Sequence, residues 1–236
     1  MINFSILITT YQRPDGSTPS VLSRALKSII NQSYPNWKIF LIGDKYENED
    51  EFLDLISIVN KEKIEYVNLD YAYERDKYSH NKQILWTCGG VNARNVGLKI
   101  IRNQGYEYCC QLDHDDYWHP NHLESLLFAI ENIPNSCMYH TLSYHFDGRI
   151  LPPNPNNGVI ETTQIGRGKL AHSSACLNLN HVTWDYTNVF ESTGRDFPAD
   201  AYMWEQIKEY CETTGNFCIS INAVTCYHLE EGNSKK

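Results

Sequence analysis

The stretch Leu112-Asp113-His114-Asp115-Asp116 decides the fold class of this chain. Its first residue ends the apolar segment 108–112, which predicts a buried strand, and the next four residues include three carboxylates. Open α/β sheets bind ligands just beyond the carboxyl ends of their strands. Carboxylates this close together repel one another unless a cation or another partner neutralises them, and Mg2+ or Mn2+ suits such oxygen ligands. The alternative is a solvated acidic turn ahead of a helix that Pro120 opens.

The residues before this stretch alternate between strand and helix patterns. Short apolar runs predict strands at 4–9, 37–42 and 64–69, and amphipathic spacing predicts helices at 20–34 and 49–60. This alternation favours a parallel sheet with helices on its faces. The sequence therefore predicts an α/β fold.

The second half of the chain changes character. A hairpin is expected around Asp147-Gly148, and the Pro- and Gly-rich residues 152–168 predict a long loop that is mobile without ligand and closes over it. The other expected elements are a loop at 71–81, helices at 91–101, from Pro120 onward and at 199–211, strands at 174–179, 217–221 and 224–227, and a frayed tail at 230–236.

Composition and charge exclude several classes of protein. The 236 residues carry 42% hydrophobic side chains, enough for a packed core, and a net charge of −9 disfavours nucleic-acid binding. No apolar run approaches the roughly 18 residues of a membrane span, and the N-terminus lacks the basic region of a signal peptide. The eight cysteines form no CxxC pair and favour buried free thiols in a reducing compartment. We therefore expect a cytoplasmic protein without a transmembrane segment.

Histidines near the acidic stretch allow a zinc hypothesis. His114, His119 and His122 are close in sequence, and zinc binds histidine. However, His119 and His122 cannot share a clean helical face if the helix begins at Pro120, and structural zinc prefers a closed set of N and S ligands. The more ordinary interpretation is histidines at a partly exposed helix start.

Five stretches in this order resemble the family 2 glycosyltransferases with the GT-A fold. The resemblance is good over residues 4–128 and patchy beyond. It implies a mostly parallel, Rossmann-like central sheet flanked by helices, with a mixed C-terminal half. It also implies a single domain over residues 1–236, in which residues 1–116 bind the nucleotide sugar and residues 117–236 bind the acceptor. The stretches are Ser5–Tyr11, Leu26–Trp37, Leu41–Asp44, Gly90–Leu98 and Leu112–Asp116.

The resemblance implies that five residues bind the nucleotide part of the donor. Thr9 and Tyr11 would line the base pocket, and Asp44 would accept a hydrogen bond from the base, most simply uracil or else guanine. Arg94 would face the donor. Asp113, similar to the first acid of a DxD motif, would touch the ribose, or the metal through water. In the family a Gly-Ser pair usually follows the residue equivalent to Asp44, and this sequence has Lys45-Tyr46 there.

The resemblance also implies a metal, a base and a reaction. Asp115 and His228 would bind Mn2+ or Mg2+, and Asp200 would be the catalytic base. The family's Glu-Asp pair is Ala199-Asp200 here, which leaves Glu205 as a rival base. Such an enzyme moves a sugar from a nucleotide sugar, here a UDP-sugar, to a hydroxyl of a glycan, glycoprotein or glycolipid, with inversion.

Two further residues and two further functions stay open. His172 could contact the acceptor or the pyrophosphate or be structural, and Trp204 could stack on an acceptor sugar or pack in the core. The same acids could serve a metal-dependent nucleotidyltransferase or phosphohydrolase, but we find neither a second acid set nor a Gly-rich phosphate loop. A sugar-binding domain without catalysis is the third possibility, which the joint presence of the candidate acids and His228 opposes.

Overall fold

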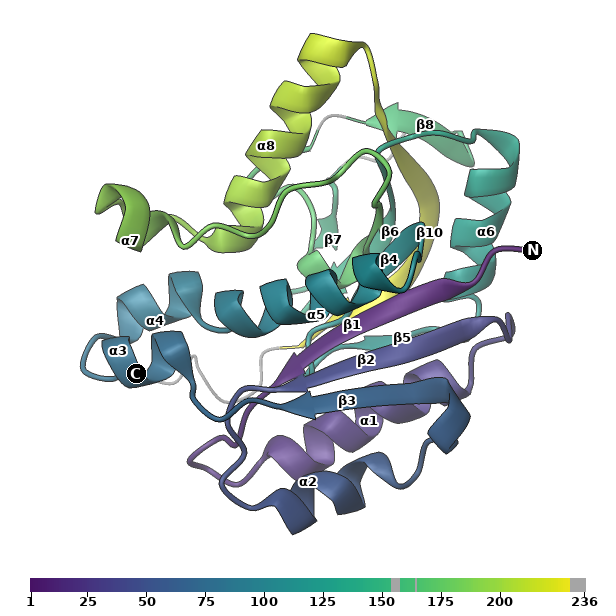
Figure 1. Ribbon diagram of the computed structural model, residues 1–236. Helices are drawn as coiled ribbons and strands as arrows, with labels where there is room; N and C mark the ends of the chain where they lie inside the picture. The colour runs from purple at the N-terminus through teal and green to yellow at the C-terminus, as the bar shows by residue number, and fades with distance from the viewer. Residues whose placement is uncertain (154–157, 164, 230–236) are drawn as a thin grey trace.

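The computed structural model describes residues 1–153, 158–163 and 165–229 (Figure 1). Its helices are α1 (Thr18–Ile30), α2 (Glu49–Ile56), α3 (Tyr73–Tyr78), α4 (Lys82–Cys88), α5 (Val91–Asn103), α6 (His122–Asn132), α7 (Val189–Thr193) and α8 (Ala199–Thr214), with short 3-10 helices η1 (Lys61–Lys63) and η2 (His172–Ser174). Its strands are β1 (Phe4–Thr10), β2 (Trp37–Gly43), β3 (Ile64–Asn68), β4 (Tyr108–Gln111), β5 (Tyr117–Trp118), β6 (Met138–His145), β7 (Ile150–Leu151), β8 (Ile160–Thr163), β9 (Ala175–Asn178) and β10 (Cys218–His228).

All of these strands belong to one sheet, in the order β3-β2-β1-β4-β9-β6-β10-β5, with β7 on β6 and β8 on β10. The strands β3, β2, β1 and β4 are parallel, β9 runs the other way, and β6 and β10 are again parallel to β4. The predicted helix-flanked α/β sheet is confirmed, parallel in its first half and mixed in its second. Because the directions agree, the carboxyl ends of β1, β2, β4, β6 and β10 lie at one edge, which we call the carboxyl edge.

Alternating side chains of the central strands build a core on each face of the sheet. Ile6 and Ile8 pack with α1, α2 and α6, whereas Leu7 packs with α5 and α8 on the other face. Figure 1 shows α1 and α2 on one side of the sheet, and α5 and α8 on the other. Strands buried on both faces explain why their sequences are continuously apolar.

A glycine sets how closely α5 approaches the sheet. A Cβ at Gly97 would lie 2.2 Å from Leu7 Cδ1 and 3.1 Å from Ile42 Cγ1, so no larger residue fits without displacement. The helix begins after Gly90, whose φ of +80° is the left-handed conformation that glycine adopts readily. This close contact fixes the first turns of α5, which carry Arg94.

Several predicted elements differ in the structure. The loop expected at 71–81 contains α3, whose six residues are too few to show an amphipathic repeat. The two late strands are one strand, β10, with register shifts between Ile221 and Cys226. The expected loop at 152–168 contains β8, which pairs with β10, and residues 154–157 and 164 lie outside the described part. The helix expected to open at Pro120 begins at His122. The predicted hairpin at Asp147-Gly148 is confirmed.

Two other predictions concern the whole chain. All eight cysteines lie in the described part and are free, as expected. Among the described residues no helix is long and apolar enough to cross a membrane. The tail predicted to fray, residues 230–236, lies outside the described residues.

Candidate active site

The carboxyl edge gathers polar residues from both halves of the chain. Tyr11 follows β1, Asp44 follows β2, the acidic stretch follows β4, and His228 ends β10. The edge therefore brings together candidates from the first and the last described strands of the chain. The strand-end rule for α/β sheets predicted this grouping.

Asp44 is a buried carboxylate at the predicted base-binding site. Only 2% of its surface is exposed, its Oδ2 accepts a 2.8 Å hydrogen bond from Arg75 Nε, and its Oδ1 is buried without a hydrogen-bond partner among the described residues. Burial raises the pKa of Asp44 despite the opposing effect of Arg75. A buried acceptor without a partner is costly, so Oδ1 is suited to a donor on a ligand.

Aromatic and cationic groups surround this carboxylate. The Arg75 guanidinium lies over the Tyr11 ring, 3.2 Å from its centroid, and the His114 ring meets the same ring edge-on at 5.3 Å. Thr9 is half-buried, with its Oγ1 facing the turn at Gly90. The structure thus places Thr9, Tyr11 and Asp44 at neighbouring strand ends.

Glu74 links this pocket to α5. Its carboxylate is almost fully buried, and Oε1 accepts a 2.9 Å hydrogen bond from the backbone N–H of Asn92 in the first turn of α5. Burial raises the pKa of Glu74 to about 7, and the nearby Asp44 carboxylate adds to the shift. The group therefore titrates close to neutral pH.

Asp113 is held by two basic side chains. Its Oδ1 lies 3.1 Å from both Arg94 Nη2 and His172 Nδ1, and its backbone N–H donates to Ser173 Oγ at 3.0 Å. Burial alone would raise the pKa of Asp113, but His172 and Arg94 hold it well below its usual range. On the other side of the imidazole, Nε2 lies 2.9 Å from the Tyr186 hydroxyl. His172 is therefore a partner of the acidic stretch.

Asp115 faces the loop after β1. Its carboxylate forms an ion pair with Arg13, and its backbone carbonyl accepts a 2.5 Å hydrogen bond from Arg24 Nη2. The Arg13 side chain is 4% exposed, whereas 21% of the Asp115 side chain remains accessible. Asp115 can thus be reached by a small ligand, although it already has a protein cation beside it.

Asp116 is buried and anchors His228. Its Oδ2 accepts a 2.5 Å hydrogen bond from Ser173 Oγ and lies 3.0 Å from His228 Nδ1, and its Oδ1 accepts the backbone N–H of Leu229 at 3.1 Å. Burial raises the pKa of Asp116 to about 6. Burial alone would lower the pKa of His228, but Asp116 and the neighbouring acids raise it to about 9. Near neutral pH the two groups form an ion pair.

The three carboxylates are therefore each neutralised by protein cations, so crowding by itself does not require a metal. Two features fit a divalent cation. Asp115 and His228 are both partly exposed, and His228 uses Nδ1 for the buried Asp116, the arrangement that orients Nε2 outward. A metal at Nε2 would take the place of the proton that this nitrogen carries near neutral pH. Within the described residues no third His, Cys or carboxylate completes a preformed site with them. Mg2+ and Mn2+ suit such a site, because they bind through one or two carboxylates together with substrate phosphates.

Asp200 lies in the first turn of α8. It is half-buried, and its charge acts on Arg94 and Tyr186. Burial opposes a charged Arg94, but Asp113, Tyr186 and Asp200 together raise the pKa of the guanidinium. Glu205, the rival base, is exposed on the helix. Asp200 and the acidic stretch thus share a neighbour, because Arg94 interacts with both Asp113 and Asp200.

Trp204 and two of the three histidines near the acidic stretch pack against other side chains of the protein. Trp204 is 1% exposed and lies in the core beneath His172, with 6.2 Å between the ring centroids. His122 stacks on Trp118 at 4.1 Å, and its Nδ1 lies 2.9 Å from Thr225 Oγ1. Because His114 contacts Tyr11, these histidines do not form a metal cluster among the described residues, and the zinc hypothesis is not supported.

Some residues of the site were not assigned from the sequence. They are the partners Arg13, Arg75, Ser173 and Tyr186, and the anchor Asp116. Asp116 offered a signal, because it extends the Asp-x-Asp pattern by one more acid. The others lie in loops or short helices, where no periodicity points to their partners.

Comparison with known proteins gives these residues a context. The family model described as glycosyl transferase family 2 matches residues 5–186. The chain is similar to the protein named uncharacterized glycosyltransferase R139 of Acanthamoeba polyphaga mimivirus, with 36% identity over 99% of this chain and 96% of that protein. The alternative of a nucleotidyltransferase or phosphohydrolase receives no support from these relatives.

Two solved structures share the fold. Residues 1–349 of TarS from S. aureus, in complex with UDP-GlcNAc, match with a TM-score of 0.67 at 15% identity, covering 100% of this chain and 62% of that one. The mannosyltransferase PcManGT of Pyrobaculum calidifontis, in complex with GDP-Man and Mn2+, matches with a TM-score of 0.59 at 12% identity, covering 98% of this chain and 58% of that one. At such identities the likeness shows the fold alone, and it confirms the predicted GT-A fold.

Proposed function

Since the chain belongs to glycosyl transferase family 2, we propose that this enzyme moves a sugar from a UDP-sugar to an acceptor hydroxyl with inversion, with the help of Mn2+ or Mg2+. The observation that carries the proposal is the junction at the carboxyl edge. There Asp113, Asp115 and Asp116 are joined to Arg94, Arg13 and His228 from three other elements. A cluster of balanced charges at this edge is suited to a charged ligand with a divalent cation.

The base of the nucleotide would occupy the pocket of Tyr11 and Asp44. The unpaired Oδ1 of Asp44 can accept the N3–H of uracil, and the Tyr11 ring, with Thr9 beside it, offers an aromatic surface. Arg75 now lies over that ring and would share the space with the base. Guanine also carries N–H donors, and the two structural neighbours bind UDP-GlcNAc and GDP-Man respectively. We choose uracil because a pyrimidine is smaller than a purine and Arg75 already lies over the Tyr11 ring.

The diphosphate would lie between the acidic stretch and its cations. Asp115 and His228 would hold the metal, and Asp113 would contact the ribose or the metal through water. When bound, the metal supplies charge stabilisation for the diphosphate leaving group. Arg94, which already faces Asp113, would supply a further positive charge to the phosphates.

Asp200 would act as the base that takes the proton from the acceptor hydroxyl. It belongs to the C-terminal half of the chain, and its charge acts on Arg94, which also pairs with Asp113. In a single displacement the base lies on the face of the sugar opposite the leaving group, which gives inversion. General-base catalysis of this kind contributes typically ~10²–10⁴-fold.

The two halves of the chain would bind different substrates, the sugar donor and the acceptor. Residues 1–116 would form the donor half and residues 117–236 the acceptor half of one domain. The acceptor would be a hydroxyl of a glycan, glycoprotein or glycolipid.

The proposal is tested by a screen of nucleotide sugars. The protein is incubated with UDP- and GDP-sugars in Mn2+, in Mg2+ or in EDTA, and release of the free nucleoside diphosphate is measured. We expect slow hydrolysis of a UDP-sugar that requires the metal, is lost in Asp115→Asn and persists in the matched control Asp185→Asn, whose carboxylate is exposed and pairs with Arg102. Hydrolysis that is equal in EDTA would contradict metal dependence, and a preference for GDP-sugars would contradict the uracil assignment.

A further inference from the structure

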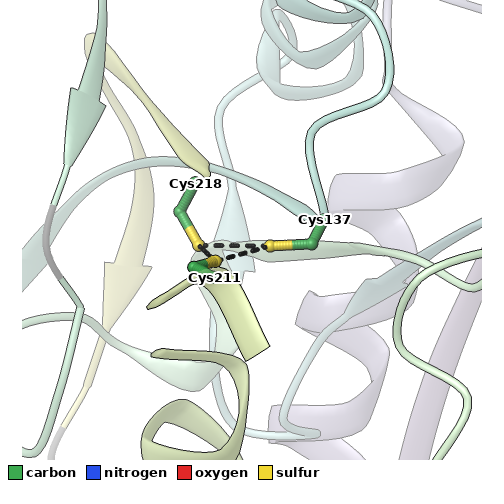
Figure 2. Close-up of side chains that lie close together, drawn as sticks. All are labelled: Cys137, Cys211 and Cys218. Carbon is green, nitrogen blue, oxygen red and sulfur yellow. Dashed lines mark hydrogen bonds between the residues drawn. The ribbon is translucent and has the colours of Figure 1, made fainter. Parts of the chain in front are cut away.

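Three cysteines from different elements meet at the edge of the sheet opposite the candidate active site. Cys137 directly precedes β6, Cys218 begins β10, and Cys211 lies in the last turns of α8. Figure 2 shows their side chains pointing toward one another. The Sγ–Sγ distances are 3.2 Å for Cys137–Cys211, 3.5 Å for Cys137–Cys218 and 3.9 Å for Cys211–Cys218.

The sulfur positions correspond to the corners of a metal site. Zinc–sulfur bonds of about 2.3 Å in tetrahedral geometry place the sulfurs roughly 3.8 Å apart. The three observed distances, 3.2 to 3.9 Å, lie close to that spacing. A disulfide requires about 2.05 Å between two sulfurs and would leave the third cysteine without a role. Three thiols that converge at comparable distances are better explained by one common ligand.

Burial and neighbouring hydrogen bonds hold the cysteine cluster in place. Cys137 and Cys218 are buried, and the Asn216 side chain orders the neighbouring backbone, because its Oδ1 accepts the N–H of Cys137 at 3.0 Å. The Asn216 Nδ2 lies 3.4 Å from His181 Nδ1, and His181 is close enough to act on the Cys211 thiol electrostatically. The half-buried Cys211 leaves a path for an ion to enter.

We propose that Cys137, Cys211 and Cys218, whose Sγ atoms all lie within 4.8 Å of one another, bind one Zn2+ ion as thiolates. His181 lies outside that set, with its Nδ1 3.0 Å from the Tyr210 hydroxyl, and on zinc binding its ring turns toward the sulfurs to become the fourth ligand. Cys3His is a common composition of structural zinc sites, and thiolate ligands select zinc over Mg2+ or Mn2+. Binding replaces three S–H bonds by metal–sulfur bonds and releases the three protons to solvent. No change of oxidation state is involved.

The ion would fix the position of α8. Cys211 is 11 residues from Asp200, or about 16 Å along the helix at the usual rise. Zinc would tie the last turns of α8 to the starts of β6 and β10, while the first turn of the helix carries Asp200 at the other edge. The site is therefore structural, and it does not depend on the transferase activity.

The experiment measures metal in the full chain purified without a metal-affinity tag after growth with added zinc. We expect about one zinc per chain by elemental analysis, as for a structural site. Replacement by Co2+ should give a thiolate-to-cobalt charge-transfer band and the intense visible bands of a tetrahedral site. Cys211→Ser is suited to the test because Cys211 is half-buried, and it should lose both the zinc and the cobalt bands. The matched control Cys88→Ala removes a buried thiol elsewhere and should keep both.

A second variant and a thiol count keep the proposal falsifiable. His181→Ala should weaken zinc binding while leaving the charge-transfer band of the three thiolates. A wild-type protein that carries no zinc and gives no such band would overturn the proposal, as would a Cys211→Ser protein that retains full zinc. Fewer than eight free thiols in the denatured, unreduced protein would also overturn it, because a disulfide would then be present.

Discussion

His228 and Asp116, which are 112 residues apart, form an ion pair in which His228 Nδ1 lies 3.0 Å from Asp116 Oδ2. The pair joins the last described strand to the turn after β4. Asp116 is fully buried, whereas 32% of the His228 side chain is exposed. The buried carboxylate thus fixes the ring and leaves Nε2 for a ligand at the carboxyl edge.

The Asp116→Asn variant should weaken metal-dependent nucleotide binding without abolishing the fold. Carboxylates that orient a metal-bound histidine contribute about 10–100-fold to metal affinity. We therefore expect a loss of this size in the affinity for UDP with Mn2+, measured by calorimetry, and little change for UDP in EDTA. His228→Ala should behave in the same way. An equal loss in EDTA would show that the pair supports the nucleotide pocket instead of the metal.

Asp44→Ala should weaken the binding of the nucleotide itself. Removing the partner of a buried donor costs about 1–3 kcal/mol, which is roughly 5–150-fold in affinity. The measurement is calorimetric titration with UDP and, in parallel, with a phosphate-matched ligand that lacks the base. Asp54→Ala is the control, because Asp54 is an exposed carboxylate on α2. If UDP binding is unchanged in Asp44→Ala, the base lies elsewhere.

Glu74 should make the folded state less stable as the pH rises toward neutrality. Its pKa is about 7 in the folded chain, above the ordinary value of 4.5, chiefly because of burial. The folded state then holds a proton that the unfolded chain has released. The stability is full below pH 4.5 and is lost progressively as the pH rises through 7.

Glu74→Gln should remove this dependence. The amide oxygen can still accept the N–H of Asn92, and no charge is buried at high pH. We expect a higher melting temperature than wild type at pH 8 and little difference at pH 5, measured by calorimetry in matched buffers. A variant that is less stable than wild type at pH 8 would show that the ionised carboxylate stabilises α5.

The sequence predicted the sheet well because its strands are buried on both faces. Continuous apolar runs such as Phe4–Thr10 and Trp37–Gly43 have few other interpretations. The strand-end rule then grouped Asp44 with the acidic stretch. The elements that were missed are short, and six residues of α3 cannot show a helical repeat.

The partners of the candidate residues were harder to predict than the residues themselves. Arg13 and Asp115 are 102 residues apart, and no spacing in the sequence connects them. The three crowded acids left a metal site and a solvated acidic turn as alternatives, whereas the fold supplies a protein cation to each acid. Cys137, Cys211 and Cys218 show none of the short sequence spacings that are typical of metal ligands. Their cluster forms where the last turns of α8 meet the starts of β6 and β10.

The most direct measurement compares Asp200→Asn with Glu205→Gln in sugar transfer. The N-cap of α8 is Pro198 and no side chain among the described residues caps the helix, so Asp200→Asn removes the base without removing a cap and leaves α8 in place. Both proteins are assayed for metal-dependent hydrolysis or transfer from the UDP-sugar found in the screen, with UDP and Mn2+ binding measured on the same samples. If Asp200 is the base, Asp200→Asn loses about 10²–10⁴-fold in rate with nucleotide binding unchanged, while Glu205→Gln stays near wild type. A near wild-type rate for Asp200→Asn, with the loss in Glu205→Gln, would contradict the assignment of Asp200 and with it our account of the acceptor half.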